Sequence, residues 1–165
     1  MSRSNFKQIS RILRLLLLAA GTVTAAQADD HGAKGPMVQP LPKYQQECAA
    51  CHIAYPAGML PAASWQHMMG SLTKHYGTDA SLDEASVREI SGWLHANAGT
   101  YKRVSEAPPQ DRITKSAWFL RKHREGEVPA NVWKRASVGS ASNCAACHTN
   151  AAKGSFSERD IRIPK

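Results

Sequence analysis

Apolar residues recur at helical spacing along much of the chain, and no convincing set of strands is present. In the first main helix, Ser64 is the expected N-cap and Gly77 is expected to follow the last turn. The residues between them that form one apolar stripe are Trp65, Met68, Met69, Leu72 and Tyr76. A shorter helix is expected before this one, over residues 43–50.

A second helix is predicted by the capping box that Ser81 forms with Glu84. Its buried face is expected to comprise Val87, Ile90 and Leu94. A linker is expected over residues 98–110, and a third helix over about residues 114–124. The final residues are short and polar, with a brief extended segment at 161–163. The expected fold class is therefore mainly α.

The N-terminus has the features of a secretory signal peptide over residues 1–28. Its basic residues are Arg3, Lys7, Arg11 and Arg14. An apolar run follows at 15–20, and an A-x-A site ends at Ala28. The run is about half of the roughly 20 residues that a spanning helix needs. We therefore expect cleavage after Ala28 and a periplasmic mature chain, rather than an uncleaved membrane anchor.

The charge of the mature chain is modest. The full sequence has 21 Lys and Arg against 13 Asp and Glu, and its net charge is +8. Without the four basic residues of the signal peptide, 17 basic residues remain against 13 acidic ones, a net charge of +4. No basic run with interleaved aromatic residues remains, so nucleic acid is not an expected partner.

All four cysteines lie in two copies of a C-x-x-C-H motif. The copies are Cys48, Cys51 and His52, and Cys144, Cys147 and His148. This motif is typical of c-type haem attachment, in which both thiols bond to one porphyrin and the histidine is the proximal iron ligand. An exported chain would otherwise favour disulfides, and zinc or dithiol sites also use C-x-x-C pairs. None of these needs a histidine after each pair, so we expect two covalently bound haem c groups.

The two motifs divide the mature chain into an N-terminal haem part, residues 29–106, and a C-terminal haem part, residues 107–165. Each part is too small to build a large core from side chains alone. We therefore expect a small helical protein in which the porphyrins supply much of the apolar interior.

The sixth ligand of each iron is expected among the remaining histidines and methionines. The candidates are His31, His67, His75, His95, His123, Met37, Met59, Met68 and Met69. On a wheel of the first main helix, His75 lies at the edge of the apolar stripe, whereas His67 points to water. His95 lies on the polar side of the second helix. His75 is therefore an expected distal ligand, and His67 and His95 are expected at the surface.

His123 is the expected distal ligand in the second half of the chain. It shares a helix face with Phe119 and Leu120, and His148 is the one other histidine of that half. The cations around it are Arg121, Lys122 and Arg124. Two interpretations of these cations stay open: a solvated face that pairs with haem propionates, or a docking patch for an acidic partner.

Over nearly all of residues 44–165, these motifs resemble those of the bacterial dihaem cytochrome c family, small periplasmic carriers found with a small oxygen-binding cytochrome. The matching segments are 48–52, 60–65, 75–77, 112–114, 118–123, 143–148 and 162–164. The resemblance implies an N-terminal part similar to class I cytochrome c and a less regular C-terminal part. It implies bis-histidine ligation of both haems, with His75 and His123 distal, and leaves open which of them serves which haem.

Electron transfer is the expected function, because two imidazole ligands leave no open position on the iron. The resemblance implies redox protein partners, a small oxygen-binding cytochrome c and a membrane cytochrome b. The chain would shuttle electrons between a membrane-bound donor and a soluble partner at low potential, without inserting into the membrane after signal cleavage. The alternative is a small haem enzyme, a peroxidase or small-molecule reductase, with one haem open to substrate.

Overall fold

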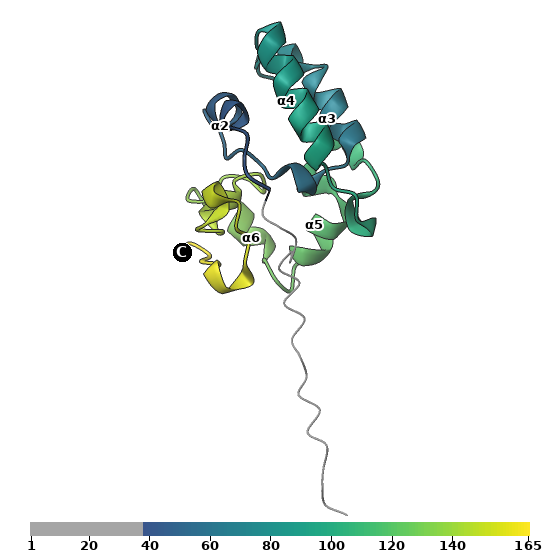
Figure 1. Cartoon of the computed structure of the whole chain (residues 1–165). Helices are drawn as coiled ribbons and strands as arrows, with labels where there is room; N and C mark the ends of the chain where they lie inside the picture. The colour runs from purple at the N-terminus through teal and green to yellow at the C-terminus, as the bar shows by residue number, and fades with distance from the viewer. Residues whose placement is uncertain (1–37) are drawn as a thin grey trace, which may run out of the picture. The chain divides into compact units, whose positions relative to one another are not determined.

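The computed structural model describes residues 38–165, and this part of the chain is mainly helical (Figure 1). Its α-helices are α2 (Pro42–Cys48), α3 (Ala62–Met69), α4 (Glu84–Asn97), α5 (Ala117–Lys122) and α6 (Ala130–Trp133). No strand occurs in this range, where the β-structure consists of two isolated bridges, His75 with Thr78 and His148 with Ile161. The expectation of a mainly α fold is confirmed.

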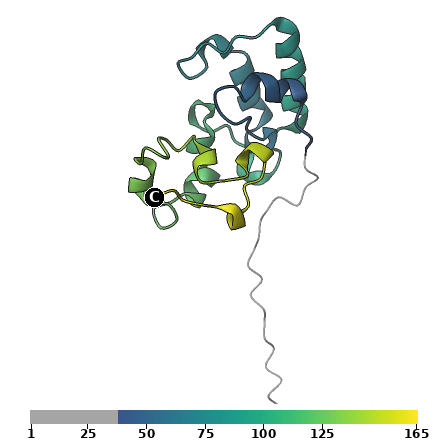
Figure 2. The ribbon, with the colours of Figure 1, turned by 90° about the vertical axis from the view of Figure 1, so that its left-hand side faces the viewer.

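Short 3-10 turns connect the α-helices and make up much of the C-terminal part (Figure 2). They cover Ala57–Met59, Leu72–Lys74, Lys102–Val104, Pro109–Asp111, Ile113–Lys115, Cys144–Ala146, Ala151–Lys153 and Glu158–Asp160. Near the C-terminus the chain is extended, and the Arg162 N–H donates to the Cys147 carbonyl over 2.9 Å. This is the less regular C-terminal part that the family resemblance implies.

α3 and α4 pack side by side over the core of the N-terminal part (Figure 1). α4 presents Ile90 and Leu94 on one face, and these side chains are 0% and 1% exposed. Full burial of an aliphatic side chain of this size stabilises a fold by about 1.5–3 kcal/mol. The other buried members of this core are Tyr44, Ala57, Leu60, Trp65 and Met69. Val87 packs against the core from the same helix, so the expected apolar face of α4 is confirmed.

α3 begins before the expected N-cap. The Pro61 carbonyl accepts the N–H groups of Ser64 and Trp65, at 3.1 and 3.3 Å. The helix therefore begins at Ala62, and Ser64 lies inside it as a buried residue. The prediction of Ser64 as N-cap is wrong, because Pro61 has the extended backbone that a helix entry needs.

α3 also ends early. Its last residue is Met69, and beyond it the Ser71 hydroxyl donates to the His67 carbonyl over 2.8 Å. That bond satisfies one of the carbonyls that a helix C-terminus leaves without an intrahelical donor. His75 and Tyr76 consequently lie beyond the helix. The prediction that His75 lies at the edge of the apolar stripe of this helix is wrong, because the helix does not reach this residue.

α4 and α5 differ from expectation at their ends. Asp83, not Ser81, caps α4, because its carboxylate accepts the Ser86 N–H at 3.0 Å. The Ser81 hydroxyl instead donates to the Asp79 carboxylate. α5 is shorter than the expected helix over 114–124, because Ser116 caps it with a side-chain bond.

The segment predicted as a linker, residues 98–110, packs against the N-terminal part. The Gly99 N–H donates to the Leu60 carbonyl over 2.8 Å, and Val104 is buried at 2% exposure. A β-carbon on Gly99 would lie only 2.5 Å from the Gly58 carbonyl oxygen, so glycine permits this close approach. This stretch is part of the packed structure, and the division at residue 106 stays a prediction.

The predicted signal peptide, its cleavage site after Ala28, and the candidates His31 and Met37 lie outside the described residues. Within residues 38–165, no helix is both long and apolar enough to span a bilayer.

Candidate functional site

Two pairs of histidine rings have the spacing of a metal centre with two imidazole ligands. The ring centroids of His52 and His75 are 6.2 Å apart, and those of His123 and His148 are 6.1 Å apart. An imidazole nitrogen binds a metal at about 2 Å, so one ion ligated from both sides holds the centroids roughly 6 Å apart. Both pairs fit a six-coordinate haem iron. The structure also brings His75 to the first motif and His123 to the second, which the sequence left open.

The first motif follows directly from α2. The helix ends at Cys48, and the Ala49 N–H closes its last turn on the Gln45 carbonyl over 3.1 Å. Burial, and then the neighbouring Glu47, raises the pKa of Cys48 to about 11. The His52 Nδ1 lies 2.7 Å from a backbone carbonyl oxygen. A proton on Nδ1 satisfies that carbonyl and leaves Nε2 free to bind a metal.

A left-handed turn, not a helix, presents His75. The residue follows a 3-10 turn, and the next two residues have φ values of 49° at Tyr76 and 98° at Gly77. Positive φ is uncommon for tyrosine, whereas glycine adopts it without steric cost. Burial lowers the pKa of His75, and the adjacent His52 and Arg112 lower it further. These effects favour the neutral imidazole, which is the form that binds a metal.

Two tyrosines flank the first histidine pair. The Tyr55 ring stacks on His52 with centroids 4.8 Å apart, and the Tyr76 ring meets the edge of His75 at 5.0 Å. The Arg112 guanidinium lies 4.1 Å above the Tyr76 ring. Sequence reasoning placed Tyr76 in the apolar stripe of the first main helix and gave Tyr55 no role, because hydrophobic periodicity does not show which loop residues meet a ligand.

The second site is built on the C-terminal end of α5. His123 follows the last residue of α5, and its Nδ1 lies 3.0 Å from the Phe119 carbonyl oxygen. The Phe119 ring stacks on the imidazole with centroids 4.0 Å apart. Burial lowers the pKa of His123. The shared face with Phe119 is therefore confirmed, whereas Leu120, predicted on the same face, is 58% exposed.

His148 is held by the second motif itself. Its N–H donates to the Cys144 carbonyl over 2.8 Å, and Phe156 lies 5.2 Å from its ring. Burial, and then His123, lowers the pKa of His148. Its Nδ1 is buried without a hydrogen-bond partner in the protein. A buried ring nitrogen without a partner is costly, so the second site keeps one polar atom that the described residues do not satisfy.

All four cysteines are unpaired. The thiols of both motifs are therefore free for bonds to a porphyrin. Residues 38–165 contain no cluster of three or more His, Cys, Asp or Glu side chains that could hold a metal ion by themselves. The donor set at each site is thus two imidazoles and two thiols, which fits haem c.

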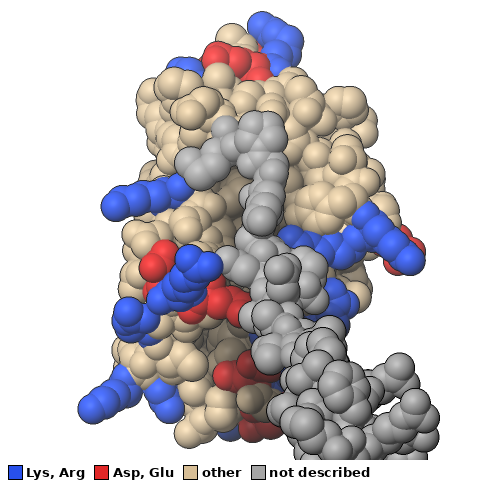
Figure 3. Space-filling model, turned by 60° about the horizontal axis from the view of Figure 1, so that its bottom comes forward, with Lys and Arg blue, Asp and Glu red and all other residues tan. Residues whose placement is uncertain are grey.

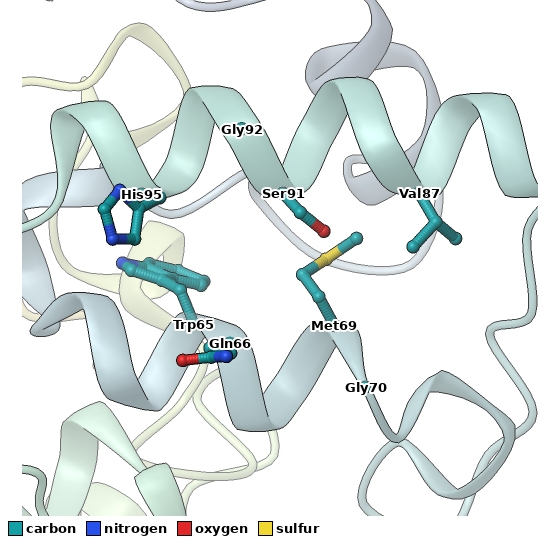
Figure 4. A pocket seen from close by; sticks show the side chains of 8 residues that line it. All are labelled: Trp65, Gln66, Met69, Gly70, Val87, Ser91, Gly92 and His95. Atoms are coloured by element: carbon teal, nitrogen blue, oxygen red, sulfur yellow. The ribbon is translucent and has the colours of Figure 1, made fainter.

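The other candidate histidines of the described segment lie elsewhere. The His67 side chain is 68% exposed, and its Nδ1 lies 3.4 Å from the Asp111 carboxylate. The predicted surface position of His67 is confirmed. His95 is also exposed. Its ring lies beside the Trp65 indole in a groove of about 460 Å³ between α3 and α4 (Figure 4). Met69, a candidate thioether ligand, is buried in the core.

The cations around His123 are largely paired with acidic side chains. Lys122 bonds Glu158 and Arg124 bonds Glu127, both at 2.9 Å. Acidic and basic side chains also lie among one another on the face shown in Figure 3. A strong field of one sign, which would steer a charged partner, is therefore weakened around this helix.

Comparison with known proteins gives a consistent result. A family model described as dihaem cytochrome c matches residues 44–156. A dihaem cytochrome c structure from Rhodobacter sphaeroides is 44% identical over 73% of this chain and all of its own, with a TM-score of 0.65. Another Rhodobacter sphaeroides structure, described as DHC, is 47% identical over the same shares, with a TM-score of 0.63. A dihaem cytochrome type c from Shewanella baltica is 37% identical over 74% of this chain and 92% of its own, with a TM-score of 0.65. No curated protein sequence matches the chain.

Proposed function

We propose that this chain, which belongs to the dihaem cytochrome c family, carries electrons in the periplasm through two low-potential haems, each with two histidine ligands. Membership of the family implies two haems and an electron-transfer protein.

The proposed ligand sets are His52 with His75 and His148 with His123. The observation that carries this assignment is the separation of the ring centroids, 6.2 Å and 6.1 Å. The two pairs lie in different halves of the chain, and their ring centroids have nearly the same separation. It is the separation that two imidazoles bound to one ion would have. The thiols of the adjacent C-x-x-C pairs are proposed to bond to the porphyrins.

In each site two histidine side chains would hold a bound haem iron, His52 with His75 and His148 with His123. When bound, haem supplies a one-electron couple at its iron. Burial keeps the imidazoles of His75, His123 and His148 neutral, because it lowers the pKa of each ring. The backbone carbonyl next to the Nδ1 of His123 fixes that ring from behind. With two imidazoles bound to each iron, neither site would keep a ligand position for a substrate.

The proposed partners are a membrane-bound donor, such as a cytochrome b, and a soluble acceptor, such as a small oxygen-binding cytochrome c. The intermixed surface charges support contacts of modest electrostatic strength rather than a single charged docking field. Weak contacts suit a carrier, because it must dissociate from each partner in turn.

Optical and EPR spectra of the oxidised, periplasm-matured protein test this function. Two bis-histidine haems give two low-spin ferric signals and no high-spin signal, and the reduced protein does not bind carbon monoxide. A high-spin signal together with rapid binding of carbon monoxide would contradict the proposal and favour the small haem enzyme instead.

A further inference from the structure

A hydrogen bond from Tyr55 joins the two halves of the molecule near both C-x-x-C-H motifs. The Tyr55 hydroxyl donates to the Ser142 carbonyl over 2.8 Å, across 87 positions of sequence. Ser142 lies two residues before Cys144, the first cysteine of the second motif. At its other end, the Tyr55 ring stacks on His52 at 4.8 Å, with planes inclined by 26°. One side chain thus contacts the histidine of the first motif and the entry to the second.

The backbone of Tyr55 is itself held by the core. Its carbonyl accepts the Tyr44 hydroxyl over 2.7 Å, and Tyr44 is 4% exposed. The Tyr44 ring packs against Trp93 of α4 with centroids 5.1 Å apart. Tyr55 is therefore fixed at its backbone, at its ring face and at its hydroxyl. A side chain that is held at these three points can keep Ser142 at a defined distance from His52.

The Tyr55 hydroxyl is the donor in this bond, because a phenol is protonated at neutral pH and a carbonyl oxygen has no proton to donate. A carbonyl cannot take up that proton, so the tyrosine is not set up to be oxidised as a radical relay.

From these contacts we propose that Tyr55 is a positioning residue for electron exchange between the two haems. The inference rests on the proposed function. With both haems bound, one electron would pass from a ferrous iron to the ferric iron of the other site, with no bond made or broken. Tunnelling rates fall steeply with distance, so a side chain that fixes Ser142 relative to His52 would hold the separation of the two sites and with it the exchange rate.

The test uses full-length, periplasm-matured protein and the variant Tyr55→Phe. This change keeps the ring on His52 and removes the bond to Ser142. Exchange cross-peaks between haem methyl signals in NMR spectra of half-reduced protein, extrapolated to low protein concentration to remove exchange between molecules, report the rate between the sites. We expect both haems to stay low-spin, the first-site EPR signal to stay unchanged, and the exchange rate to fall severalfold.

Tyr101→Phe is the matched control, because the Tyr101 hydroxyl also donates to a backbone carbonyl, that of Gly58 at 3.1 Å, but within the first half. It should leave the exchange rate unchanged. Tyr55→Leu removes the ring as well, and should additionally shift the first-site EPR signal by freeing the imidazole of His52 to rotate.

Three outcomes keep the two proposals separable. If wild-type protein lacks two low-spin haems, the proposed function fails. If wild-type protein has them, but Tyr55→Phe exchanges electrons at the wild-type rate or no more slowly than Tyr101→Phe, the role of Tyr55 is overturned and the function stands. A fall in thermal stability without a change in exchange rate would assign Tyr55 a structural role alone.

Discussion

The imidazole planes of His123 and His148 are inclined by 65°, whereas those of His52 and His75 are inclined by only 27°. The two pairs therefore match in separation and differ in relative rotation. Rotation about the metal–nitrogen bonds decides how the ring orbitals act on the iron, so two sites with the same ligands need not be electronically equivalent.

We expect two distinct low-spin signals in the EPR spectrum of the oxidised protein. Nearly parallel rings split the iron orbitals strongly, whereas rings near a right angle leave them closer in energy and give a larger maximum g value. The larger value should belong to the second site. His75→Ala should remove the other signal, and two identical signals would contradict the ring angles.

Replacing His75 with alanine should open the first iron. The variant removes one of the two rings 6.2 Å apart, and no other described histidine is paired with His52 in this way. One haem should become high-spin or bind carbon monoxide after reduction. The control is His67→Ala, whose ring is 68% exposed and faces Asp111. Loss of a low-spin haem in His67→Ala but not in His75→Ala would refute the assignment.

His123→Met should raise the potential of one haem while leaving it six-coordinate if the thioether reaches the iron. Thioether ligation favours ferrous iron relative to imidazole. The other haem should shift far less, because its ligands are unchanged. Spectroelectrochemical titration of both haems measures the effect, with His95→Ala as the surface control. Equal shifts of both potentials would argue against His123 as a ligand of a single site.

The mature protein should carry two covalent haems on a chain that starts at Asp29. Each motif supplies two thiols and a histidine, and all four cysteines are unpaired. Mass spectrometry of periplasm-matured protein should therefore show two haem additions that survive acid denaturation. Loss of one haem addition in Cys144→Ala, with the other kept, would assign the second haem to the second motif. A wild-type chain with only one haem would contradict the prediction of two covalent haems.

Neutralising Arg121, Lys122 and Arg124 together distinguishes docking from internal pairing. Because Lys122 and Arg124 already bond Glu158 and Glu127, we expect electron-transfer rates and their dependence on ionic strength to change little. Stopped-flow reduction at several salt concentrations measures both. A large fall in rate with loss of the salt dependence would instead establish a docking patch for an acidic partner.

The local sequence pattern predicted much of the fold, because an amphipathic helix is recognisable from the spacing of its apolar residues. The face of Val87, Ile90 and Leu94 was correct, since a stripe recurring every three or four residues has one way to be buried. Helix ends were less predictable. The Pro61 carbonyl and the Ser71 hydroxyl set the ends of α3, and such hydrogen bonds depend on how the flanking loops turn.

The sequence alone determined the two C-x-x-C-H motifs and hence the residues beside each proposed haem, because attachment chemistry depends on adjacent residues. It also indicated His123, as the one candidate of its half. The tertiary structure decided that His75 meets His52 through a left-handed turn after α3 has ended, and that Tyr55 reaches Ser142 across 87 positions. Both are contacts between loops, and a loop's partners depend on the packing of the whole chain, which no local spacing encodes.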